Sequence, residues 1–101
     1  MKRGKFIKIP KVRALNGEIR LKKTFRSWKL KPSEISAIKL EKVLSLVDEI
    51  GIFLDAGPVF FFTDATPNFQ KIADLLRFNE LFGEGWYQRA ESGEKLSWKR
   101  A

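Results

Sequence analysis

Cationic side chains alternate with apolar ones along residues 19–31, and this spacing is the first sign of chemistry in the sequence. The cations are Arg20, Lys22, Arg26, Lys29 and Lys31. The apolar residues between them are Ile19, Leu21, Phe25, Trp28 and Leu30. Side chains of a strand point to opposite faces in turn, so Arg20, Lys22 and Arg26 should project opposite Ile19, Leu21 and Phe25, and Lys29 and Lys31 opposite Trp28 and Leu30. If these two segments are neighbouring strands, the cations share one face. Such a face is suited to bind phosphate groups, and it is also what an ordinary solvated sheet face carries.

The charge of the chain is concentrated near its N-terminus. Residues 1–42 hold 14 of the 20 Lys and Arg against three acids, a balance of +11. Residues 43–86 have seven acids against two cations, and residues 87–101 have four cations against two acids, which gives the formal net charge of +8. A basic N-terminal half favours an anionic partner: a nucleic acid, a phospholipid surface or an acidic protein face.

Aromatic side chains near the C-terminus are the second candidates for ligand contact. Proteins that bind nucleic acids on β-sheets interleave exposed aromatic rings with cations, so that bases stack on the rings. Here Phe25 and Trp28 are expected in the core, whereas Trp86, Tyr87 and Trp98 are the candidates for exposure. A Trp at the junction of a helix and a hairpin is more often packed on the core, and that interpretation stays open.

Catalytic chemistry finds little support in the composition. The sequence has no His and no Cys, so it lacks the commonest general base, the commonest transition-metal ligand and any thiolate. The carboxylates Asp48, Glu49, Asp55 and Asp64 do not follow the alternating spacing of a calcium loop and are typical of turns. We therefore expect no enzyme activity, no metal and no cofactor.

Hydrophobic periodicity and turn residues predict strands in the N-terminal half. Residues 5–9 alternate as a strand does, and Pro10 indicates a sheet edge, a bend or a bulge. Asn16-Gly17 separates two strand-like runs and favours the positive backbone angles of a tight hairpin turn. Residues 33–47 are ambiguous: strands are the interpretation that we prefer, and a helix with one apolar face fits as well.

Another hairpin, one helix and a closing hairpin complete the prediction. Residues 50–54 and 59–62 are apolar, β-branched or aromatic on either side of turn residues, which indicates the hairpin. Thr66-Pro67 is typical of a helix start, and an amphipathic pattern then continues over residues 67–82. Residues 86–99 predict the closing hairpin, with its turn at Ser92-Gly93.

These elements predict a single α+β domain over residues 1–101. Strands joined by tight turns pair antiparallel, so we expect an antiparallel sheet or half-open barrel of about five to seven strands with one amphipathic helix near the C-terminus. The longest apolar run, residues 59–62, is far shorter than the roughly 20 residues of a membrane span, and the N-terminus lacks the apolar stretch of a signal peptide. We expect a cytoplasmic protein without a transmembrane segment.

Taken in order, the segments resemble the bacterial pleckstrin-homology-like families. The resemblance rests on Trp28-Lys29-Leu30, on the turn and strand of residues 31–38, on the hairpin of residues 51–63 and on the helix of residues 67–82. It covers roughly residues 5–82; such domains usually end on the helix, whereas this chain continues. The resemblance implies a roll of antiparallel strands and a binding or assembly module, sometimes oligomeric. It carries over no ligand residues.

Three functions stay open on the sequence alone. The first is a non-enzymatic binding or assembly module whose basic N-terminal sheet face holds an anionic or protein partner. The second is a small nucleic-acid-binding β protein, and the third is a structural subunit that forms homo-oligomers. A steep salt dependence of nucleic-acid binding favours the second, because phosphate contacts release counterions. A mass in solution several times that of one chain favours the third.

Overall fold

The computed structural model describes residues 6–43 and 49–100. The strands within these ranges are β1 (Phe6–Lys8), β2 (Lys11–Leu15), β3 (Glu18–Lys23), β4 (Arg26–Leu30), β5 (Ala37–Val43), β6 (Glu49–Asp55), β7 (Val59–Thr63) and β8 (Leu96–Lys99). Between β7 and β8 lie the helices α1 (Phe69–Leu75), α2 (Phe78–Phe82) and α3 (Trp86–Glu91). A 3₁₀ turn, Pro32–Glu34, precedes β5.

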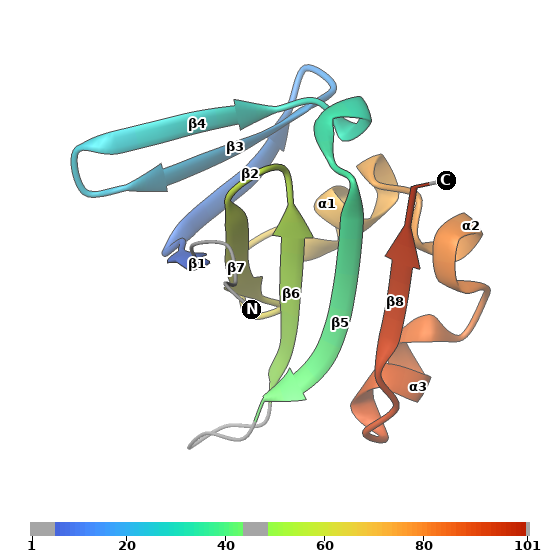
Figure 1. The fold of residues 1–101 in the computed structure, drawn as a ribbon. Coiled ribbons are helices and arrows are strands. Elements are labelled where there is room, and N and C mark those ends of the chain that lie inside the picture. The colour runs from blue at the N-terminus through green and yellow to red at the C-terminus, as the bar shows by residue number, and fades with distance from the viewer. Residues whose placement is uncertain (1–5, 44–48, 101) are drawn as a thin grey trace, which may run out of the picture.

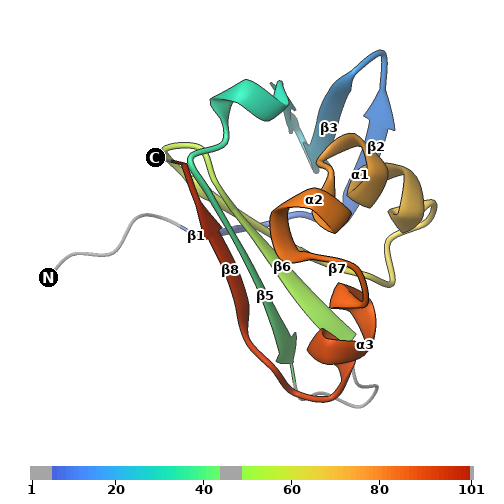
Figure 2. The same cartoon turned by 90° about the vertical axis from the view of Figure 1, so that its right-hand side faces the viewer.

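The described strands form two sheets, and the three helices cover one face of the larger sheet (Figures 1 and 2). The larger sheet has the order β1-β7-β6-β5-β8, and the smaller one has the order β2-β3-β4. Among these strands, only β1 and β7 pair in parallel. The predicted α+β class is confirmed. The sheets do not close into a barrel, and the eight strands exceed the predicted number.

Pro10 separates the two sheets. Ile9 still pairs with the larger sheet, since its backbone N–H donates to the carbonyl of Phe61 at 2.8 Å. Proline has no N–H to continue this ladder, and β2 begins at the next residue as part of the smaller sheet. β1 is an edge strand of the larger sheet. Of the alternatives predicted for Pro10, the structure shows the bend, which follows the edge strand β1.

Two-residue turns set the register of the smaller sheet. Asn16 and Gly17 have φ angles of 52° and 75°, as the hairpin turn predicted here requires. The next turn is Thr24-Phe25, between the paired residues Lys23 and Arg26, with a φ of 45° at Thr24. In Figure 1 this end of the smaller sheet projects away from the larger one.

The hairpin predicted around residues 55–58 is confirmed by the pairing of β6 with β7. Asp55 Oδ1 accepts a hydrogen bond from the backbone N–H of Gly57 at 3.2 Å, so this carboxylate stabilises a turn as expected. In residues 33–47 the strand interpretation is confirmed for Ala37–Val43, which form β5. Residues 44–47 lie outside the described residues, as does Asp48.

One hydrophobic core joins the two sheets and the helices. In the smaller sheet, Ile19 and Leu21 are 0% and 1% exposed. The buried residues of the larger sheet include Ile38, Leu40, Ile50, Ile52, Leu54, Phe60 and Phe62, and those of the helices include Ile72, Ala73, Phe78 and Trp86. Strand side chains alternate, so one face of the smaller sheet supplies this core and its other face is left to solvent.

The amphipathic helix predicted over residues 67–82 is in fact two helices. Arg77 has a left-handed backbone with φ of 59°, which ends α1 and precedes α2. The change of chain direction at Arg77 brings Phe78 into the core, where its side chain is 1% exposed. The burial of Phe78 explains why the helix is interrupted at Arg77. The predicted start is wrong too, because Asn68 and not Thr66 precedes the first helical residue.

The closing hairpin predicted over residues 86–99 is wrong. Trp86 and Ala90 are four residues apart and both buried, so the segment follows the helical period and forms α3. Strand β8 pairs with β5, which is distant in sequence, and Leu96 lies opposite Leu40. The predicted pairing of β8 with residues 86–90 is therefore absent, since these residues belong to α3.

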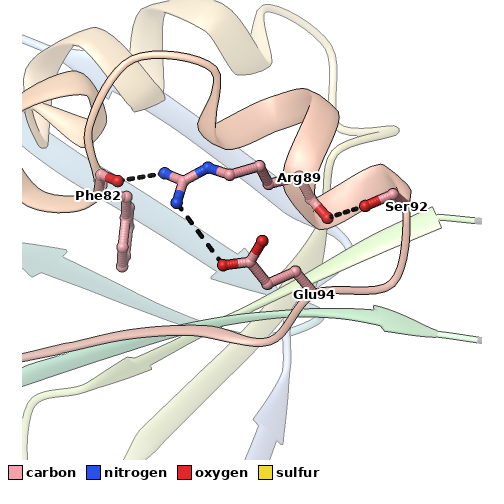
Figure 3. A network of polar contacts seen from close by, with 4 residues as sticks. All are labelled: Phe82, Arg89, Ser92 and Glu94. Carbon is pink, nitrogen blue, oxygen red and sulfur yellow. Dashed lines mark hydrogen bonds and ion pairs between the residues drawn. The ribbon is translucent and has the colours of Figure 1, made fainter.

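The side chain of Arg89, in α3, contacts both the end of α2 and the turn before β8 (Figure 3). Its guanidinium donates to the Phe82 carbonyl and pairs with the Glu94 carboxylate at 3.6 Å. Ser92 Oγ donates to the carbonyl of Arg89 at 2.8 Å. These contacts lie within the C-terminal elements, so this cation is part of the scaffold.

Leu76 should contribute strongly to stability, because its side chain is 5% exposed and packs in the core. Replacing Leu76 with Ala removes buried methyl groups and leaves a cavity, so we expect the free energy of unfolding to fall by about 2–5 kcal/mol. Denaturant unfolding followed by tryptophan fluorescence measures the loss.

Leu15→Ala is the matched control for this prediction. It removes the same atoms from a side chain that is 41% exposed, and surface changes of this kind shift stability by about 0.5 kcal/mol or less. Equal losses in the two variants would contradict the burial of α1 against the sheets.

Candidate functional site

The outer face of the smaller sheet gathers cations from all three of its strands. In the register of the sheet, Arg13 lies opposite Arg20, and Arg20 lies opposite Lys29. Lys11 lies opposite Lys22 in the adjacent row. Residues directly opposite in an antiparallel sheet share a face, with Cβ atoms about 4.5–5.5 Å apart. We call Lys11, Arg13, Arg20, Lys22 and Lys29 the cationic face.

Within the described residues, Glu18 is the one acid on this side of the sheet. Its Oε1 lies 3.3 Å from Arg20 Nη2, and the two side chains are 23% and 31% exposed. The Nε atom of Arg20 is buried and has no hydrogen-bond partner in the part of the chain described. The central cation is thus held in place by a single carboxylate while one of its donors is unsatisfied.

A groove of about 640 Å³ runs along these strands and extends to Pro67 and Asn68. Arg13, Arg20 and Lys29 all line it. Arginine presents a planar set of donors that fits phosphate oxygens, and lysine adds a point charge. The groove thus places three cations with such donors side by side.

The structure brings together three of the five cations predicted as a site: Arg20, Lys22 and Lys29. Arg26 is on the other face, so its predicted place is wrong. It lies opposite Lys23, and its Cζ is 5.0 Å from the centre of the Trp28 ring. A two-residue turn pairs residue i with residue i+3, which reverses the odd and even positions that face the core.

Two further predictions about this sheet are corrected. Phe25 was expected in the core with Ile19, but it sits in the turn and is 98% exposed. Lys31 lies beyond the end of β4, where its backbone N–H donates to Glu34 Oε1 at 2.7 Å, so it is not part of the cationic face.

The sequence analysis missed Lys11 and Arg13. Their signal was present, because a two-residue Asn16-Gly17 turn places residue 13 opposite residue 20 and residue 11 opposite residue 22. Extending the predicted hairpin backward by this rule would have found both cations.

The C-terminal aromatic residues lie apart from the cationic face. Trp86 is 5% exposed and its Nε1 donates to Asn79 Oδ1 at 3.0 Å, so its predicted exposure is wrong. Trp98 is half-buried on β8, with Arg100 Cζ 5.2 Å from its ring centre. In Figure 2, α3 and β8 lie away from β2 and β3, and neither Trp86 nor Trp98 lines the groove of the cationic face.

Tyr87 belongs to a second, smaller constellation. Its hydroxyl donates to Asp64 Oδ2 at 2.7 Å, and Asp64 Oδ1 accepts the backbone N–H of Ile50 at 3.0 Å. This hydrogen bond, together with burial and the charges of Asp64 and Glu91, raises the pKa of Tyr87 to about 12. Both oxygens of Asp64 are thus engaged in joining α3 to β6, which is a structural role.

No protein-family model, curated protein or solved structure matches this chain. Within residues 6–43 and 49–100, no three acidic side chains gather closely enough to hold a metal ion. None of the helices in this part of the chain is long and apolar enough to cross a membrane.

Tyr87 is the sole tyrosine, so tyrosinate absorbance during alkaline titration reports this one group. We expect a midpoint near 12, above the usual value of about 10. The folded state favours the neutral phenol, so its contribution to stability is complete below pH about 10 and is lost as the pH rises toward about 12.

Asp64→Asn should move this midpoint down toward 10, because it removes the carboxylate that accepts the Tyr87 hydrogen bond. Glu91→Gln is the matched control, since it removes one nearby negative charge but no hydrogen bond to Tyr87, and it should cause a smaller change. If Asp64→Asn left the midpoint where it was, the hydrogen bond would not be the main cause.

Proposed function

We propose that this protein is a non-enzymatic binding module that holds a phosphate-bearing polyanion on its cationic face. The observation that carries the proposal is the register of the smaller sheet. It aligns Arg13, Arg20 and Lys29 in one row across three strands, next to a second pair of cations. A polymer of phosphates fits such a row better than a small anion does, because several charges are neutralised at once.

The alignment is costly for the isolated protein, and this argues against a face that serves solubility alone. Like charges directly opposite in a sheet destabilise it by roughly 0.2–1 kcal/mol a pair. Three such pairs occur here, and Glu18 offsets one of them only in part. Mixed charges give solubility without this cost. A bound polyanion would relieve the repulsion, because its phosphates carry the opposite charge.

The amino-acid composition favours a binding module over an enzyme. A chain without His or Cys has few residues that take up and release protons near neutral pH. Two acids of its central part, Asp55 and Asp64, are engaged in hydrogen bonds of the scaffold.

The finer fold assignment, a pleckstrin-homology-like roll, also stays a proposal. It is supported by two antiparallel groups, β2-β3-β4 and β5-β6-β7, which precede α1. The parallel pairing of β1 and the strand β8 after the helices are departures from that arrangement. The assignment adds no ligand residues to the cationic face.

The proposal predicts that loss of the cationic face changes the salt dependence of binding. We expect Arg13→Gln, Lys22→Gln and Lys29→Gln together to weaken binding of duplex DNA and to flatten the slope of log K against log salt. The slope should change by about 0.9 for each lost contact. Fluorescence anisotropy of a dye-labelled duplex at a series of salt concentrations measures both quantities.

The matched control replaces Lys39, Lys95 and Lys99 with Gln. These exposed cations lie on β5, on β8 or just before β8, and both triple variants reduce the net charge by three from +8. The control should keep the slope of the wild type. Equal weakening in both variants would mean that net charge and not the cationic face governs binding. No binding by the wild type at low salt would reject the proposal and favour homo-oligomerisation, which a measurement of mass in solution then tests.

A further inference from the structure

Phe25 is the most exposed large apolar side chain in the described chain, at 98%. It occupies the tip of the β3–β4 hairpin, the part of the smaller sheet that projects in Figure 1. We call residues 22–28 the arm. A ring this exposed adds almost nothing to the core, so its position at the tip has no explanation in folding.

A shallow recess lies beside this ring, between the arm and β1. Its volume is about 290 Å³, at the small end for ligand pockets, and Ile7, Phe25 and Trp28 form its apolar lining. Trp28 is held in place from behind, because its ring meets that of Phe60 edge-on at 5.3 Å. The recess therefore has one fixed aromatic wall and one ring that is open to solvent.

Cations border the recess as well. Lys23 and Arg26 lie opposite each other on the arm and line the recess, and the guanidinium of Arg26 stands over Trp28. Lys22 points to the other face of the arm, where the cationic face begins. Among the described strands β4 pairs with β3 alone, so a flexible chain can pass around this edge from one face to the other.

We propose that the recess takes an unpaired base of a single-stranded nucleic acid. The base stacks on Phe25 beside Trp28, Lys23 and Arg26 contact the neighbouring phosphates, and the backbone continues onto the cationic face. The inference rests on the proposed function and names the class of polyanion. Rings next to cations are what single-strand binding uses, since every base has a face that stacks.

The surroundings of Phe25 favour a base over the other phosphate-bearing partners. Its neighbours at the tip are Lys23, Thr24 and Arg26, so the tip offers a bilayer one fully exposed apolar side chain, while Trp28 is half-buried. One ring is sufficient for one base. In a duplex the bases are already paired and stacked, and a base reaches such a recess only if it is first flipped out.

Phe25→Leu and Phe25→Trp test the inference. Leucine keeps the apolar character but cannot stack, whereas tryptophan stacks at least as well as phenylalanine. With a dye-labelled oligothymidylate as the probe, we expect Phe25→Leu to weaken binding about 5- to 150-fold, the range for the loss of one stacked base. Phe25→Trp should bind as the wild type does. The thermal midpoint should not change in either variant, because the side chain is outside the core.

The salt dependence separates this inference from the proposed function. Stacking releases no counterions, so Phe25→Leu should lower the affinity at every salt concentration and leave the slope unchanged, unlike the cationic-face variant. If the wild type binds the oligothymidylate with a steep slope but Phe25→Leu binds equally well, the inference is wrong and the proposed function stands. If the wild type binds no nucleic acid, both are wrong.

The duplex of the same oligonucleotide and vesicles of phosphatidylcholine with phosphatidylserine complete the test. We expect weaker binding to the duplex than to the single strand, and no effect of Phe25→Leu on it. Vesicle binding that exceeds single-strand binding and survives in Phe25→Leu would overturn the inference in favour of a membrane surface, because leucine inserts into a bilayer as well as phenylalanine does.

Discussion

The register of the smaller sheet is the constraint on which the surface chemistry depends. Two tight turns set it, and the burial of Ile19 and Leu21 selects the same register, since a slip by one residue would expose both. Burying such side chains contributes about 1.5–3 kcal/mol each, whereas a pair of opposed cations costs about 0.2–1 kcal/mol. The core therefore outweighs the repulsion. The sheet therefore keeps this register although its outer cations repel one another.

The acidic and basic parts of the chain have different places in the fold. Carboxylates of the acidic centre serve the scaffold: Asp55 closes a turn, and Asp64 connects β6 to α3 through Ile50 and Tyr87. At the other end of the chain, Arg100 donates to backbone carbonyls of the segment before β5 at 2.9–3.2 Å. The smaller sheet, in contrast, carries a row of cations on its outer face.

Sequence reasoning was accurate for most strands and for the first hairpin turn, but two other local signals misled it: the helix start at Thr66-Pro67 and the closing hairpin around Ser92-Gly93. Asn16-Gly17 correctly predicted its hairpin, and most strands were predicted from the alternation of apolar and polar residues. It failed at Thr24-Phe25, because neither residue is typical of a tight turn, and the unseen turn put Phe25 in the core and Arg26 on the wrong face. The left-handed Arg77 likewise has no local signal, since the burial of Phe78 in the tertiary structure demands it. The cationic face was thus predictable in large part, and the aromatic tip was not.

The parallel pairing of β1 with β7 has a consequence for the order in which the chain can assemble. Ile7 meets Phe60, and Leu40 meets Leu96, only after long stretches of chain have been gathered, whereas β2, β3 and β4 are joined by turns of two residues. Loop closure costs entropy that rises with the length of the loop, and non-local pairing slows folding. We therefore expect the pairing of β1 and β8, the two outer strands of the larger sheet, to be the slow part of folding, whereas β2, β3 and β4 pair through contacts that are close in sequence.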